Sequence, residues 1–126
     1  MKAIGYFNIR ESGGSFVFEN RLADYCQRNG HQLIRIFIDE DLSVSERPKY
    51  IEMMAYLREH GMESLVIVGE ARDLGDSLEV ATRNLLEIDS FGAKVLCCGD
   101  EEAPDPFQQI VRQWSRSGTS GSRSNL

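Results

Sequence analysis

Four short apolar runs alternate with stretches of helical periodicity, and this alternation constrains the fold more than any other feature of the sequence. The runs cover residues 3–9, 33–38, 65–68 and 95–98 and are rich in β-favouring residues. Between them, apolar side chains recur at helical spacing, as in Phe18, Leu22, Tyr25 and Cys26. Crossovers of one helix each predict a three-layer α/β fold with Rossmann-like alternation, whose central sheet has about four mainly parallel strands.

The helical segments carry start and stop signals. Pro48 opens a helix that ends at Gly61, and its expected core stripe is Tyr50, Met53, Met54 and Leu57. Asp76 with Glu79 three residues later has the pattern of a capping box. The next helix along the chain is expected to bury Leu78, Ala81, Leu85 and Ile88.

Length and cysteine usage exclude several classes of protein. A chain of 126 residues fits one domain with a core of its own. The three cysteines are odd in number and include the adjacent pair Cys97 and Cys98, so we expect reduced, buried thiols and no zinc site. No apolar run reaches membrane-spanning length and no leader pattern is present, which favours a cytoplasmic protein without membrane contact.

Charge is distributed unevenly along the chain. Residues 1–60 carry 9 acids and 8 bases, residues 61–111 carry 11 acids and 3 bases, and residues 112–126 carry 3 bases and no acid. The local net charges are therefore −1, −8 and +3. The central part of the chain should repel DNA, so DNA binding by this chain alone is expected to be weak or absent.

Sites in parallel α/β sheets lie at the carboxyl ends of the strands. Three segments meet that condition here, namely 8–15, 39–47 and 69–77. The turn Ser12, Gly13, Gly14 and Ser15 precedes a helix, where backbone N–H groups can hold a phosphate, although a flexible turn is the simpler interpretation. Asp39, Glu40 and Asp41 follow the second strand and could hold Mg²⁺, but a solvated loop is favoured. No metal or cofactor is predicted.

The landmarks of these segments resemble the resolvase/invertase class of serine recombinases. Residues 3–10 with Leu22, Tyr25 and Gly30 resemble its opening, and 37–39 followed by Ser43 and Arg47-Pro48 resemble its second strand and next helix. Residues 66–68 followed by 72–77 resemble its third strand and the turn after it. The resemblance spans residues 3–98 and implies a resolvase-like fold.

The same resemblance implies that the active-site residues are largely missing. In that family a serine hydroxyl attacks a DNA phosphodiester and becomes joined to the DNA, while arginines stabilise the phosphate. The family motif Tyr-x-Arg-x-Ser falls on Tyr6, Asn8 and Arg10, so both its arginine and its nucleophile are absent. Two further family arginines fall on Asp73 and Asp76, and its aspartate falls on Arg72. Arg47 is the one phosphate-facing residue that matches.

These substitutions favour loss of strand cleavage and a role in interaction or regulation. Loss of a nucleophile that acts with its neighbours as a unit costs on the order of 10⁶ in rate. Ser12 would replace the nucleophile if the loop were shifted by two residues, which leaves an active DNA strand-exchange enzyme as an alternative. A small phosphate- or nucleotide-binding protein that uses the 12–15 turn with Arg47 and Arg72 is a second alternative.

The last part of the sequence offers a candidate partner surface. Asp105 and Pro106 predict a short helix that carries Phe107, Ile110, Val111 and Trp114 on one face. This face either packs against the rest of the domain or binds a partner, which would be a second copy or a related recombinase. The predicted domain therefore covers residues 1–114, and the Ser/Gly-rich segment 115–126 is predicted to be a disordered tail.

Overall fold

Strands and helices alternate along the computed structural model, which describes residues 1–9, 14–40, 47–62, 64–99 and 105–112. The elements are β1 (Lys2–Asn8), α1 (Gly14–Asn29), β2 (Gln32–Asp39), α2 (Pro48–His60), β3 (Ser64–Val68), the 3-10 helix η1 (Ala71–Asp73), α3 (Leu78–Ser90) and β4 (Lys94–Cys97). A short helix lies beyond them at 106–112. The expected alternation is confirmed, with boundaries within one or two residues of the predicted ones.

The four strands form one parallel sheet in the order β2-β1-β3-β4. Every residue of β3 is buried, as expected for a central strand with helices on both faces. Tyr6 of β1 lies between Phe37 of β2 and Val68 of β3, and Asn8 is paired with Asp39. The register therefore brings the last residues of β1 and β2 to the same edge of the sheet.

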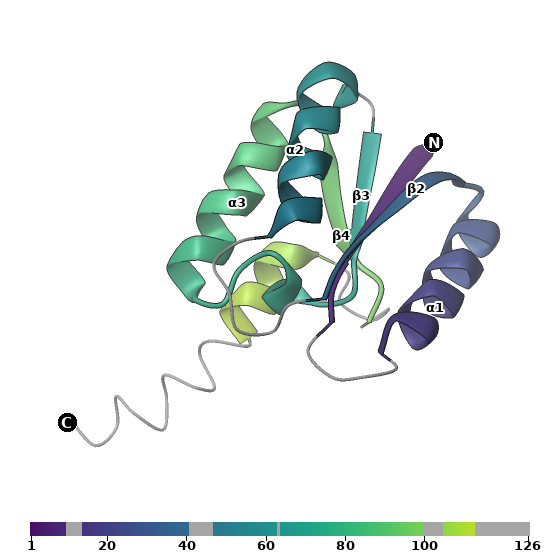
Figure 1. Cartoon of the computed structure of the whole chain (residues 1–126), viewed down its shortest axis with the longest axis horizontal. Helices are drawn as coiled ribbons and strands as arrows, with labels where there is room; N and C mark the ends of the chain where they lie inside the picture. Colours follow the sequence, from purple (N-terminus) through teal and green to yellow (C-terminus); the bar gives the residue numbers. More distant parts are fainter. Residues whose placement is uncertain (10–13, 41–46, 63, 100–104, 113–126) are drawn as a thin grey trace.

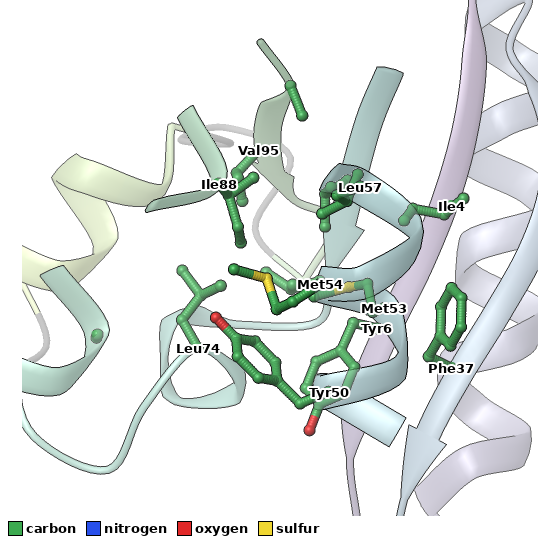
Figure 2. Packing of buried hydrophobic residues seen from close by; sticks show 14 of the residues in the cluster. Ile4, Tyr6, Phe37, Tyr50, Met53, Met54, Leu57, Leu74, Ile88 and Val95 are labelled. Carbon is green, nitrogen blue, oxygen red and sulfur yellow. The ribbon is translucent and has the colours of Figure 1, made fainter. Parts of the chain in front are cut away.

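Helices cover both faces of the sheet and divide the core into two clusters. Helix α1 lies on one face, where Phe18, Leu22 and Cys26 pack with β1 and β3. Helices α2 and α3 lie on the other face, together with the 106–112 helix (Figure 1). Figure 2 shows the cluster beneath α2, where Tyr6, Phe37 and Tyr50 lie close to Met53 and Leu57. The three-layer α/β prediction is confirmed.

Helix α3 departs from its predicted cap and core face. Its N-cap is Ser77 rather than Asp76, because the Ser77 hydroxyl accepts a hydrogen bond from the Val80 N–H at 3.2 Å. Leu78 is exposed, whereas Asn84 is buried and donates to the Leu74 carbonyl at 2.6 Å. The helix is thus rotated so that Ala81, Asn84 and Ile88 face the core.

The 106–112 helix divides the predicted apolar stripe between core and surface. The Asp105 carboxylate accepts from the Phe107 N–H at 3.0 Å, which agrees with the expected start signal. Ile110 packs into the core beneath α2 and α3, but Phe107 and Val111 are exposed. Trp114 and the segment 115–126 lie outside the described residues.

Cysteine burial agrees with the sequence interpretation. Cys26, Cys97 and Cys98 are free and buried. Burial raises the pKa of all three thiols, that of Cys98 to about 11, so these thiols stay protonated at neutral pH. Within the described residues, no helix is both long and apolar enough to cross a membrane.

Candidate functional site

The strand ends at the carboxyl edge of the sheet converge on a network built around Tyr6. The Tyr6 hydroxyl donates to Asp39 Oδ2 at 2.6 Å, which joins the ends of β1 and β2. The same hydroxyl oxygen accepts from Arg47 Nε at 3.2 Å, which brings in the residue before α2. The Asn8 N–H and the Arg47 guanidinium in turn donate to Asp73, so the described parts of the three predicted segments meet at one edge, as expected for this sheet.

Asp39 caps the N-terminus of α2 from outside the helix and does not lie in a solvated loop. Its carboxylate accepts from the backbone N–H of Lys49 at 2.8 Å and from that of Tyr50 at 3.0 Å. The Asp39 residue is 3% exposed, so the expectation of a solvated acid is wrong at this position. An anion at a helix N-terminus is stabilised by the free N–H groups and by the helix dipole.

Sequence reasoning missed this role of Asp39 although one signal was present. The N-cap position of α2 is Arg47, and no side-chain cap bond is made from that position. A helix that begins without a capping side chain needs an acceptor from elsewhere in the chain. Asp39, at the end of a predicted strand and shortly before the helix, was the acid placed to supply it.

Arg47 binds the surrounding protein through most of its guanidinium. Nη1 donates to the Leu74 carbonyl at 3.0 Å, and Nη2 donates to the Asp73 carbonyl. The guanidinium carbon lies 4.2 Å from the centre of the Tyr50 ring and 5.2 Å from that of Tyr6. Arg47 therefore connects the β3–α3 segment to β1 and α2, and its charge is balanced by carbonyl dipoles and ring faces.

Asp73 is the most buried acid of this edge. It is 0% exposed, and its carboxylate accepts from the Asn8 N–H at 3.2 Å and from the Glu70 N–H at 2.9 Å. The Glu70 bond belongs to a capping box around η1. Asp73 thus fixes the turn after β3 against the end of β1, where two N–H groups satisfy its charge.

The sequence-predicted site residues are partly brought together. Asn8, Arg47 and Asp73 meet at this edge, and Asn8 is buried. Asp76 is exposed in the turn before α3. Arg72 is exposed, and its Nε donates to Glu70 Oε1 at 2.6 Å, so it forms an ion pair on the surface.

The predicted phosphate-binding turn is described in part. Arg10, Ser12 and Gly13 lie outside the described residues. Gly14 and Ser15 form the first residues of α1. Within the described ranges, no group of three His, Cys, Asp or Glu side chains is arranged to hold a metal ion.

The two tyrosines that surround Arg47 differ in how their hydroxyl groups are satisfied. The Tyr6 hydroxyl is hydrogen-bonded, whereas that of Tyr50 is buried without a hydrogen-bond partner among the described residues. Figure 2 shows the Tyr50 oxygen pointing toward Leu74, away from the Tyr6 oxygen. Burial raises the pKa of both phenols far above the ordinary value, and the Asp39 hydrogen bond raises that of Tyr6 further. Neither phenolate forms at neutral pH, so neither tyrosine is available there as an anionic nucleophile.

Comparison with protein families relates this architecture to a known group. The model of the family "Resolvase, N terminal domain" matches residues 19–120, which is most of the chain. The match begins within α1 and leaves β1 and the segment after it outside. Comparison with curated proteins gives no significant match.

Solved structures of several serine recombinases share the fold. A resolvase family site-specific recombinase from Streptococcus pneumoniae aligns with a TM-score of 0.69 and 14% identity, over 99% of this chain and 89% of that one. The N-terminal catalytic domain of TP901-1 integrase aligns with a TM-score of 0.67 and 12% identity, over 97% and 98% of the two chains. The C-terminal catalytic domain of ISC1926 TnpA, an IS607-like serine recombinase, aligns at 0.62 with 16% identity, over 100% and 86%.

Proposed function

This chain belongs to the resolvase N-terminal domain family, and from that premise we propose that it is a serine-recombinase-type domain that does not cleave DNA. We propose that it acts instead through protein pairing, either with a second copy or with an active relative. The proposal rests on how the carboxyl edge of the sheet uses its charged residues.

One observation carries the proposal: a buried carboxylate occupies a position where the resemblance implies a phosphate-binding arginine. Asp73 is 0% exposed, and two backbone N–H groups hold its carboxylate in place. A carboxylate about 4 Å from a phosphate is repelled by about 4 kcal/mol at an effective dielectric of about 20. This edge of the sheet therefore opposes the phosphate that a cleaving enzyme has to bind.

The contacts of Arg47 support the same conclusion. The resemblance places a phosphate-facing arginine at this position, yet three nitrogens of the guanidinium donate to protein acceptors. Three of its five N–H groups are thus used within the protein, and the bonds to the Asp73 and Leu74 carbonyls hold the β3–α3 segment in place. The β3–α3 segment has one arginine of its own, Arg72, and this side chain forms an ion pair with Glu70 on the surface.

The nucleophile position gives independent support. The resemblance places the attacking serine at position 10, where this chain has Arg10. Serine is a weak nucleophile and needs an activating base or fixed positive charge around the phosphorus. A chain without that serine and with acids at two of the arginine positions lacks both requirements of the family's reaction.

A trap for covalent protein–DNA adducts tests the proposal. The full chain is incubated with duplex DNA that carries recombination sites of the family, then denatured with detergent, and end-labelled DNA that migrates with protein is measured. An active serine recombinase domain serves as the positive control. We expect a labelled band for the control and none for this chain.

The Ser12→Ala variant separates the alternatives. An adduct formed by the wild-type chain and lost in Ser12→Ala would overturn the proposal and restore the strand-exchange enzyme. Salt-dependent DNA binding is measured in parallel, because a DNA enzyme loses affinity steeply as salt rises. We expect little binding at any salt concentration.

A further inference from the structure

The outward side of α3 carries a shallow hollow that no described element fills. The residues that line this α3 hollow are Ser77, Leu78, Glu79, Thr82, Arg83 and Leu86. Leu78 is 49% exposed and Leu86 is 60% exposed, and Thr82 lies between them at the spacing that aligns side chains along one face of a helix. Another apolar group would therefore be buried favourably between the two leucines.

The described part of the chain ends beside this helix. Ile110 belongs to the same core cluster as Leu74 and Ala81, which lie four residues before and three residues after Leu78. Figure 1 shows the 106–112 helix next to the end of α3 at which Leu78 lies. Trp114 is four residues beyond Ile110, so the chain allows up to about 14 Å between their Cα atoms. That length exceeds the diameter of a helix with its side chains, about 10–12 Å, so Trp114 can reach the outward side of α3.

The lining of the α3 hollow suits an indole ring. The two leucines offer apolar contact, the Arg83 guanidinium offers a cation for the ring face, and the Glu79 carboxylate offers an acceptor for the indole N–H. Charge is complementary as well. The exposed charges of α3 are Glu79, Glu87 and Asp89 against Arg83 alone, whereas residues 113–126 carry two arginines and no acidic side chain.

From reach, ring chemistry and charge we infer that Trp114 of the same chain fills the α3 hollow. Residues 113–116 then form a strap across the start of α3, and the two exposed leucines are covered within a single copy. The inference goes beyond the proposed function, because it concerns a contact within one chain and does not depend on whether the domain cleaves DNA or pairs.

The fluorescence of Trp114 tests the contact in the full chain. Trp114 is the only tryptophan of the sequence, so the emission reports this residue alone. The folded chain is compared with the same chain in urea and with N-acetyltryptophanamide. We expect the folded chain to emit at a shorter wavelength than both references and to be quenched less by acrylamide, because the ring is shielded from water.

Variants of the hollow show where the ring lies. Leu86→Glu should move the emission toward that of N-acetyltryptophanamide and raise the acrylamide quenching constant at least about twofold, because a carboxylate beside the ring would lose its water. Arg83→Gln removes the cation at nearly constant size and should act in the same direction but less strongly. Ile51→Glu is the matched control, since Ile51 is 64% exposed on α2 and outside the hollow, and it should leave the emission unchanged. Circular dichroism checks that each variant keeps its helices.

Several outcomes would overturn the inference. These are a folded wild type whose tryptophan is as accessible as N-acetyltryptophanamide, a Leu86→Glu variant with unchanged emission, and an equal change in Ile51→Glu. Emission that shifts as protein concentration is varied would assign the ring to a second copy and would also contradict a contact within one chain. The adduct trap reports cleavage and not the environment of Trp114, so failure of the proposed function and failure of this contact are distinguishable.

Discussion

Replacement of Arg47 by alanine distinguishes an arginine that stabilises the fold from one that is available to bind a phosphate. The change removes hydrogen bonds to the Tyr6 hydroxyl and to the carbonyls of Asp73 and Leu74, together with contacts to two tyrosine rings. Each hydrogen bond contributes about 1 kcal/mol net, and the ring contacts add about 0.5–1 kcal/mol. The Leu74 carbonyl keeps its bond from Asn84, which lowers the total. We expect the free energy of unfolding to fall by about 3 kcal/mol.

Urea unfolding followed by circular dichroism measures this loss, and Arg35→Ala is the matched control. Arg35 also lies over aromatic rings, 4.5 Å from the Phe37 centre, but its guanidinium pairs with Glu52 on the surface. Removal of such an exposed pair should cost less than about 1 kcal/mol. A loss for Arg47→Ala no larger than that of the control would refute the reasoning, because Arg47 would then be free to serve a ligand.

Three further predictions concern the same edge of the sheet. Tyr50→Phe should leave the free energy of unfolding unchanged or raise it by about 1 kcal/mol, because the buried hydroxyl has no hydrogen-bond partner in the part of the chain that the structure describes. Tyr6→Phe should lower it by about 1–2 kcal/mol through loss of the Asp39 bond, and urea midpoints compare the two variants. Burial raises the pKa of both tyrosines, so their titration should leave the free energy of unfolding unchanged below about pH 10. Above about pH 10 the free energy of unfolding should fall, by up to about 1.4 kcal/mol per pH unit for each tyrosine. Alkaline unfolding curves that match for wild type and Tyr50→Phe would contradict this. Gly75→Ala should lower the free energy of unfolding by about 1–3 kcal/mol, since a Cβ there would lie 2.6 Å from the Ala81 backbone nitrogen. A thermal midpoint equal to that of the wild type would contradict this, because the backbone of the turn would then shift to accommodate the methyl group.

The fold could be predicted because its signals are local. Residues 65–68 are four consecutive β-favouring residues, and the structure buries the whole of β3. Pro48 and Gly61 mark the two ends of α2 in the sequence itself. Alternation of such segments leaves few topologies other than a parallel sheet with helices on both faces.

The details of the edge could not be predicted because they depend on contacts distant in sequence. Tyr6 and Asp39 are 33 positions apart, and Asn8 and Asp73 are 65 positions apart. Helical periodicity alone did not fix the rotation of α3, because the buried Asn84 is satisfied by a carbonyl outside its own helix. Periodicity also did not show which side of the 106–112 helix meets the core, where Ile110 is buried while its neighbour Val111 is exposed.

The role of Arg47 is tested most directly by following its side chain while DNA is added. Nuclear magnetic resonance of the ¹⁵N-labelled full chain reports the Nε–Hε group that donates to the Tyr6 hydroxyl. We expect this signal to exchange slowly with water and to stay in place as duplex DNA is titrated at low salt. A saturable shift of the Arg47 signal that weakens as salt is raised would contradict a purely structural arginine, because the guanidinium would then be binding phosphate.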